Sequence, residues 1–264
     1  MPNRDTAFAG SIPELYDRFL GPLLFLPYAE EVAARVSRWK PEHILETASG
    51  TGIVAEAIHR AAPTARIVAT DLNQAMLDVA TRRLKSDHVC FQVADAQHLP
   101  FPNESFDLVV CQFGVMFFPD KAKANSEAWR VLKPGGHYLL VIWDKLDRNP
   151  VSQLLAEAVA AEFPADPPRF LERAPFGYAD RDTIDRDMRA GGFTDISIEA
   201  VELSSRVSAS EAARGMCLGS PLTAEIEERG QGAVTRATTA AERALQKFDG
   251  QDVPMSALFV TATK

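Results

Sequence analysis

The sequence predicts an α/β fold built on a mostly parallel sheet. From residue 43 onward, short β-branched runs alternate with helical stretches, the pattern of strand–helix–strand units. Leu139-Leu140-Val141-Ile142-Trp143 is apolar at every position, as expected of a parallel strand that is buried on both faces. The small-residue stretch Ala48-Ser49-Gly50-Thr51-Gly52 separates the first such strand from a helical pattern. With 264 residues, the chain is long enough for one large domain with a sizeable insertion.

The first half of this domain is expected to contain five strands and three connecting helices. The strands are predicted at 43–47, 66–71, 89–95, 106–113 and 136–143, and the helices at 52–61, 73–84 and 121–132. The third helix should end before Pro134-Gly135-Gly136, because proline and glycine do not continue a helix. Two earlier helices are predicted at 12–20 and 27–38, before the sheet begins.

After Asp144 the pattern changes. Helices are predicted at 151–163 and 181–190, a strand at 194–204, a helical segment over 208–248 and a last strand at 256–263. Val234, Ala237, Ala241 and Leu245 recur at helical spacing, which gives the 208–248 segment an apolar face. The domains expected are therefore an N-terminal helical cap, 1–40, and a sheet domain, 41–264, with a lid insertion at about 205–250.

The overall composition excludes several classes of function. The net charge is −8 and no basic cluster occurs, which argues against nucleic-acid binding. No run approaches the length of a membrane span, and no signal segment is recognisable. The three cysteines are scattered, with neither a CxxC pair nor the spacing of a metal site. A reducing cytoplasm is the expected compartment, and the sequence carries no indication of an oligomeric state.

The small-residue turn indicates a nucleotide-type ligand. Gly50 and Gly52 let a ligand approach the backbone, and Asp71 follows 19 residues after Gly52, at the predicted end of the second strand. A carboxylate in that place suits the two adjacent hydroxyls of a ribose. Because Gly50-x-Gly52-x-x-Ala55 also fits the dinucleotide fingerprint, the turn alone leaves a nicotinamide cofactor open.

The end of the third predicted strand favours one adenosine-containing cofactor over a nicotinamide dinucleotide. Asp95-Ala96 stands there, and its carboxylate can accept a hydrogen bond from an adenine amino group. The segment from Ile44 to Gly52, together with Asp71 and Asp95-Ala96, resembles the class I S-adenosylmethionine-dependent methyltransferases. The similarity is greatest to their small-molecule, quinone-biosynthesis-like subset (methyltransferase type 11). It covers about residues 10–145 well and the remainder only in outline.

The resemblance implies a Rossmann-like, seven-stranded sheet with an antiparallel last strand, helices on both faces and a helical lid. It also implies S-adenosylmethionine as cofactor and S-adenosylhomocysteine as product, with O-, N- or C-methylation of a small-molecule acceptor. The implied cofactor-binding residues are Glu46, Ala48, Gly50, Gly52, Asp71, Leu72, Met76, Asp95, Ala96 and Gln112. In the family, glycine usually stands where this chain has Ala48, and a Cβ there narrows the space beside the methionine moiety.

An aromatic segment after the fourth strand is a candidate acceptor pocket, since ligands of open α/β sheets bind at the carboxyl ends of the strands. Phe113 and Met116 are its best candidates, with Tyr16 and Tyr28 from the N-terminal helices. No catalytic residue and no metal ligand is assigned, because positioning alone can supply much of the rate of methyl transfer. Two alternatives stay open: an NAD(P)-dependent oxidoreductase, and a non-catalytic cofactor-binding module.

Overall fold

The computed structural model describes residues 4–6, 8 and 10–264, which form two compact units. The sheet unit consists of 28–143, 178–201 and 257–264, and the helical unit of the described residues up to Pro27 with 144–177 and 202–256. These units cut across the predicted domain ranges. Helix α2 (Leu26–Trp39) lies in the sheet unit from Tyr28 onward, because Tyr28, Val32 and Val36 are fully buried in its core. The segment 144–177 groups instead with the predicted lid.

The sheet confirms the predicted topology. Its strands are β1 (His43–Thr47), β2 (Arg66–Asp71), β3 (Val89–Val93), β4 (Phe106–Gln112), β5 (Leu132–Trp143), β6 (Asp195–Arg206) and β7 (Asp252–Thr263). They lie in the order β3-β2-β1-β4-β5-β7-β6. The first five strands pair in parallel, and β7 pairs antiparallel with β5. The strand order reverses between β1 and β4, which is where open α/β sheets bind ligands.

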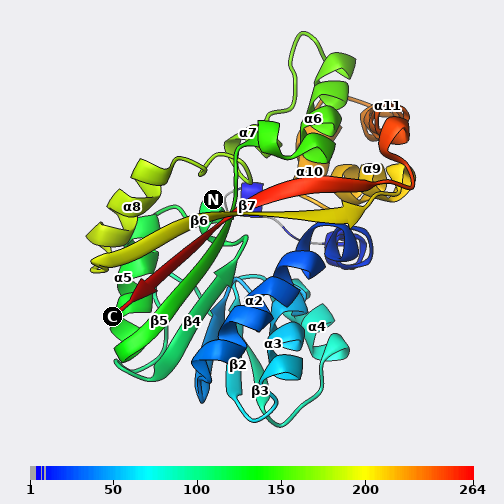
Figure 1. Ribbon diagram of the computed structural model, residues 1–264. Helices are drawn as coiled ribbons and strands as arrows, with labels where there is room; N and C mark the ends of the chain where they lie inside the picture. The colour runs from blue at the N-terminus through cyan, green and yellow to red at the C-terminus, as the bar shows by residue number, and fades with distance from the viewer. Residues whose placement is uncertain (1–3, 7, 9) are drawn as a thin grey trace. The chain divides into compact units, whose positions relative to one another are not determined.

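Helices cover both faces of this sheet (Figure 1). The helices α2, α3 (Ile53–Ala61) and α4 (Gln74–Arg83) lie on one side, and α5 (Lys121–Val131) and α8 (Arg181–Ala190) lie side by side on the other. The short helix η3 (Val115–Phe117) follows β4. Leu45, Leu108, Val110 and Leu139 are fully buried, so the middle strands form the core between the two helical layers. These layers fix the positions of the turns at the carboxyl ends of the strands.

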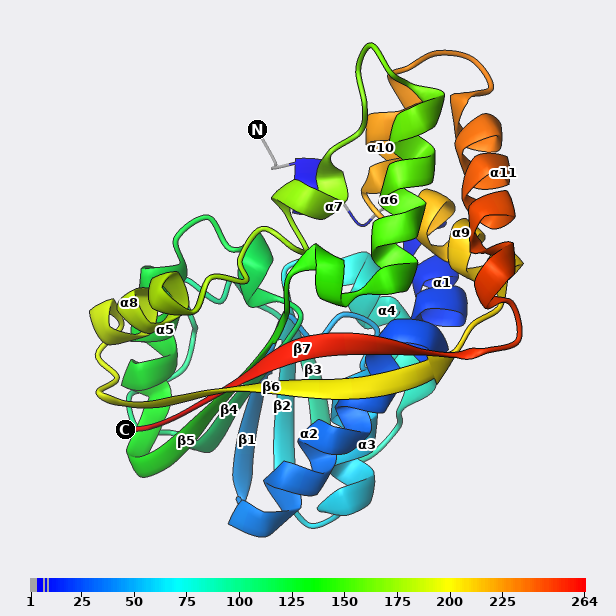
Figure 2. The same cartoon turned by 45° about the horizontal axis from the view of Figure 1, so that its top comes forward.

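The helical unit packs several shorter helices together (Figure 2). They are η1 (Arg4–Thr6), α1 (Ile12–Leu15), η2 (Tyr16–Phe25), η4 (Leu146–Arg148), α6 (Pro150–Glu162), α7 (Phe170–Arg173), α9 (Ala209–Leu218), α10 (Leu222–Glu227), α11 (Ala233–Leu245) and η5 (Gln246–Phe248). Helix α11 packs against α6 and α9 along its buried residues Ala237, Ala241 and Leu245. A Cβ on Gly215 of α9 would lie 2.6 Å from Leu20 Cδ2, so glycine is what lets α9 approach η2.

Several predicted segment boundaries differ from the structure. Strands β5 and β7 begin at Leu132 and Asp252, four residues before their predicted starts at 136 and 256. The N-terminal helices are not separate, since α1, η2 and α2 run on continuously from Ile12 to Trp39. Pro22 is accommodated because η2 is a π-helix, in which the N–H of Leu26 donates to Gly21 O five residues earlier. Conversely, the predicted 208–248 segment consists of three α-helices, α9, α10 and α11, interrupted around Gly219 and Gly230, followed by the short η5. Across the described residues, no helix is long and apolar enough to cross a membrane.

Candidate functional site

The glycine-rich turn after β1 adopts left-handed backbone at alternate positions. The φ angles of Ala48, Gly50 and Gly52 are 53°, 54° and 80°. Ser49 N–H donates to Thr70 O at 2.9 Å, and this hydrogen bond ties the turn to the end of β2. A Cβ added at Gly50 would meet nothing closer than Met76 Cε at 4.0 Å, so that side of the turn is open. At Gly52 a Cβ would come within 3.0 Å of Ala80 Cβ, and this glycine is needed for packing against α4.

Asp71 holds the turn through its carboxylate. Its Oδ2 accepts from Gly50 N–H at 2.8 Å, and its Oδ1 accepts from Asn73 N–H at 2.8 Å. Burial, the largest effect, raises the pKa of Asp71, while the N–H groups of Asn73 and Gly50 oppose that rise. Each carboxylate oxygen has two lone pairs. Asp71 can therefore shape the turn and still accept hydrogen bonds from a ribose.

Glu46 is the most buried charged group of the turn. It is 1% exposed, and its Oε2 has no hydrogen-bond partner. Burial, followed by the nearby Asp71 carboxylate, raises the pKa of Glu46 well above its usual value, against the N–H of Ala55. The hydroxyls of Ser49 and Thr51 are likewise buried without a partner. Since buried polar groups normally have partners, these three side chains indicate a polar ligand.

A second group of residues lies at the ends of β2 and β3. Leu72 is 59% exposed and Val93 is 45% exposed, which is unusual for large apolar side chains. Val93 pairs in register with Asp71, and the buried Met76 lies in the first turn of α4, five residues after Asp71. Val93 is not among the candidate site residues that the sequence predicts. The signal that could have indicated it is an apolar residue two positions before Asp95.

Asp95 is held by the loop that follows it. Its Oδ1 accepts from the N–H of Gln97 at 2.9 Å and from the side-chain amide of Gln97 at 3.2 Å. Burial alone would raise the pKa of Asp95, but hydrogen bonds from Gln97 and His98 lower it below its usual value. Ala96 beside it is buried. His98 has an exposed side chain, with Nδ1 3.5 Å from Asp95 Oδ2.

Glu127 and Arg130 of α5 anchor the same loop. Glu127 Oε2 accepts from Leu99 N–H at 2.8 Å, and Arg130 Nη2 donates to Leu99 O at 2.9 Å. Arg130 Nη1 also donates to Phe101 O at 2.7 Å. Neither Arg130 nor Glu127 is among the residues that the sequence predicts for the site. The structure shows that Arg130 fixes the loop after Asp95, and that Glu127 is part of the same contact.

The segment after β4 is strained and closely packed against the glycine-rich turn. Gln112 is buried at the end of β4, in register with Val141. Phe113 follows with φ 54°, in the left-handed region that non-glycine residues rarely adopt. A Cβ on Gly114 would lie 2.4 Å from Ala48 Cβ, so the turn and this segment touch. Strained backbone of this kind often occurs at ligand sites.

An aromatic cluster surrounds Phe113. Its ring stacks on Trp143 with centroids 3.8 Å apart, and Tyr28 meets both rings edge-on at 5.4 and 5.6 Å. The Tyr28 hydroxyl donates to Val201 O at 3.2 Å. Met116 is also buried in this segment. Trp143 was read from the sequence only as a strand residue, because its side-chain direction depends on the pairing of β5.

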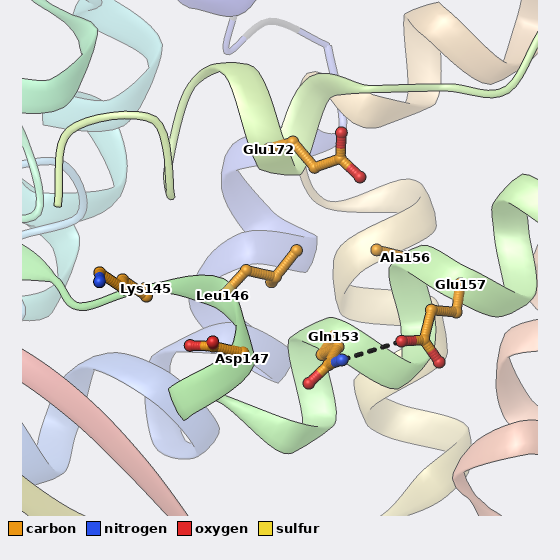
Figure 3. A pocket seen from close by; sticks show the side chains of 7 residues that line it. All are labelled: Lys145, Leu146, Asp147, Gln153, Ala156, Glu157 and Glu172. Carbon is orange, nitrogen blue, oxygen red and sulfur yellow. Dashed lines mark hydrogen bonds between the residues drawn. The ribbon is translucent and has the colours of Figure 1, made fainter.

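Tyr16 belongs to the helical unit, where its ring stacks on Phe25 at 4.7 Å and meets Phe8 edge-on at 5.7 Å. The helical unit has a pocket of its own, of about 400 Å³, shown in Figure 3. It is lined by Lys145, Leu146, Asp147, Gln153, Ala156, Glu157 and Glu172, none of which is a predicted site residue. No metal centre is indicated, since the residues that the structure describes contain no group of three His, Cys, Asp or Glu able to hold an ion.

The predicted cofactor residues fit S-adenosylmethionine. Glu46 can meet a cation, the hydroxyls of Ser49 and Thr51 can meet a carboxylate, and the open side of Gly50 leaves room for the chain of a ligand. Asp71 and Asp95 provide acceptors at the next two strand ends. The assignment of each contact to a part of the cofactor remains a prediction.

Comparison with known proteins places the chain in a family. Residues 45–140 match the model of a methyltransferase domain. The demethylmenaquinone methyltransferase of Deinococcus radiodurans is 36% identical over 138 residues, which cover 51% of this chain and 57% of that protein. The ubiquinone/menaquinone biosynthesis C-methyltransferase UbiE of Ralstonia pickettii is 33% identical over 175 residues, which cover 62% of this chain and 71% of that protein. The chain thus spans less than two thirds of the first of these relatives and more than two thirds of the second.

Solved structures share the fold. The [4+2]-cyclase SpnF is 19% identical with a TM-score of 0.61, over 96% of this chain and 93% of that chain. The phosphoethanolamine N-methyltransferase 2 of Haemonchus contortus, in complex with S-adenosyl-L-methionine, is 20% identical with a TM-score of 0.55, over 97% of this chain and 60% of that chain. The curated relatives are methyltransferases rather than oxidoreductases, which settles the alternative that the glycine motif left open. The chain belongs to the class I S-adenosylmethionine-dependent methyltransferases.

Proposed function

We propose that the protein methylates a ring carbon of a small, planar hydroquinone-type acceptor. The buried, unpartnered side chains of Glu46, Ser49 and Thr51 carry the cofactor part of this proposal. The acceptor part is supported by the aromatic cluster of Tyr28, Phe113 and Trp143, and by the names of the relatives. These three rings are buried, with Phe113 the most exposed at 7%, and stacking of a planar acceptor on aromatic rings of this kind is favourable.

When bound, S-adenosylmethionine supplies a methyl group on a positively charged sulfur. In the proposed reaction the acceptor enters as its hydroquinone anion, and a ring carbon forms the new bond to the methyl carbon. The sulfur–methyl bond breaks with its electron pair staying on sulfur, and the ring proton then passes to water as the ring regains its aromaticity. The chain's own contribution is to hold the two partners in line, which can be worth up to about 7–11 kcal/mol. Gly114 and Ala48 bring the aromatic segment against the glycine-rich turn, so the two partial sites adjoin.

No histidine is needed as a base in this scheme, because an ionised hydroquinone already makes its ring carbon nucleophilic. His43 and His137 lie at or near the amino-terminal side of their strands. His98 is the histidine nearest the predicted cofactor residues along the chain, and its side chain is exposed. We also propose a reducing, cytoplasmic setting, which the three free cysteines support.

The experiment has two stages. Calorimetry with S-adenosylmethionine, S-adenosylhomocysteine and NADH tests the cofactor, and binding of NADH alone would contradict the proposal. The protein is then incubated with S-adenosylmethionine and a reduced naphthoquinone that has a free ring position, with a fully ring-substituted naphthoquinol as control. Methylated product from the first acceptor only is the expected result. Methylation of both acceptors would indicate transfer to oxygen instead of carbon.

A further inference from the structure

The two carboxylates of the glycine-rich turn differ in what surrounds them. Asp71 accepts hydrogen bonds from the backbone of Gly50 and Asn73. Glu46 is 1% exposed, and its Oε2 is buried without a partner. Glu46 and Asp71 come from neighbouring parallel strands, in which Glu46 pairs with Ala69 and Thr47 with Thr70. The turn therefore contains two buried carboxylates, and Asp71 has more hydrogen-bond donors than Glu46 to stabilise a negative charge.

The groups that face Glu46 offer no positive charge. From β2 it meets the Asp71 carboxylate, from β4 the Cys111 thiol, and from α3 only the backbone N–H of Ala55. Burial raises the pKa of that thiol to about 12, so Cys111 is neutral. Within the described part of the chain, no lysine, arginine or histidine is paired with Glu46. A buried carboxylate that lacks a cation and faces a second carboxylate favours its protonated form.

We propose that Glu46 carries a proton in the cofactor-free protein and releases it to solvent when the cofactor binds. The O–H bond of the Glu46 carboxyl breaks, the proton goes to buffer, and the carboxylate left behind is balanced by the positive ammonium group that S-adenosylmethionine and S-adenosylhomocysteine both carry. The raised pKa of Glu46 agrees with this geometry. The inference rests on the cofactor binding that the proposed function requires, and it is independent of the acceptor.

Two consequences distinguish this behaviour from a permanently ionised glutamate. Cofactor affinity rises with pH until Glu46 is ionised in the free protein, by up to tenfold per pH unit. The observed binding enthalpy also depends on the buffer, because the released proton is taken up by it. An ionised Glu46 would give neither effect.

The test is calorimetric titration with S-adenosylhomocysteine at neutral pH, in phosphate and in Tris, whose enthalpies of protonation differ widely. The wild-type protein should release close to one proton per cofactor bound. Glu46→Gln, which cannot titrate, should release markedly less. Glu56→Gln is the matched control, because Glu56 pairs with Arg83 at 2.8 Å and should leave the proton count unchanged. Equal release from wild type and Glu46→Gln would overturn the inference.

A second measurement needs no variant. The Kd of the wild type for S-adenosylhomocysteine is measured from about pH 5.5 to 7, below the range in which an amino group titrates. A steady fall in Kd supports the proposal, and a flat profile contradicts it. Binding without proton release would reject the role of Glu46 and leave methyl transfer intact. Absence of any binding would reject both.

Discussion

Gly114→Ala is the sharpest test of how the turn and the segment after β4 fit together. Gly114 has φ −105° and ψ −43°, a conformation that alanine adopts without strain. Its ideal Cβ would nevertheless lie 2.4 Å from Ala48 Cβ and 2.9 Å from Cys111 Sγ. Real Cβ atoms essentially never approach so closely, so the backbone has to move. In the folded state the effect of the substitution is therefore one of packing.

The expected cost is about 1–3 kcal/mol of unfolding free energy, the range for an added methyl group in a well-packed core. Ala48→Gly removes one of the two clashing atoms. By itself, Ala48→Gly removes the strain of an alanine in left-handed backbone, which is worth about 1–2 kcal/mol. The substitution also makes the unfolded chain more flexible, which lowers stability by about 0.4–1 kcal/mol. Its net effect should lie between about zero and about 1.6 kcal/mol of added stability. The double variant should then recover at least about 1 kcal/mol of the loss caused by Gly114→Ala.

The assay is urea unfolding of the four proteins of this cycle, followed by tryptophan fluorescence. The three tryptophans, Trp39, Trp129 and Trp143, all lie in the sheet unit, so the signal reports on the unit that is perturbed. Additive effects, with no recovery in the double variant, would refute the contact between Ala48 and Gly114. Gly135→Ala is a poor control, since Gly135 has φ 78° and alanine would be strained there. Ala75→Gly in the first turn of α4 is a better one, and it should show no coupling to Gly114→Ala.

Three further outcomes are expected. Asp71→Ala should weaken S-adenosylhomocysteine binding by about 1.5–3 kcal/mol for each ribose hydrogen bond lost. The substitution should also lower stability, because Gly50 N–H loses its acceptor. Unchanged binding in calorimetry would show that Asp71 has a structural role alone. Glu46→Gln should make the cofactor-free protein more stable than wild type at about pH 8 and nearly equal to it near pH 4, as urea unfolding can measure. The raised pKa of Glu46 means that the folded wild type binds the extra proton, so wild-type stability falls as pH rises from 4.5 through the folded pKa. Finally, if 12–38 and 208–248 act as a lid, their amide hydrogen exchange should slow on cofactor binding, whereas equal exchange in both states would make them fixed structure.

The sequence alone was sufficient to predict the sheet and the positions of the candidate cofactor residues along it. Strand β1 was predicted with its observed limits, His43–Thr47, and β2 with Arg66–Asp71. Both are short β-branched runs whose ends are marked by local signals: a small-residue turn after one and a carboxylate after the other. Glu46, Gly50 and Asp71 lie within one such unit. Interactions between residues close in the sequence therefore determine the positions of these three residues in the fold.

Contacts between distant residues decided the rest. No local pattern reveals that Gly114 is required by Ala48, 66 positions earlier, or that Trp143 stacks on Phe113. The helix through Pro22 was missed because a proline normally ends an α-helix, whereas a π-helix accommodates it here. The unequal environments of Glu46 and Asp71 were also invisible in the sequence, where both read as strand-end carboxylates. Burial and hydrogen bonding are properties of the packed chain, so only the tertiary structure could show that both oxygens of Asp71 have partners while Oε2 of Glu46 has none.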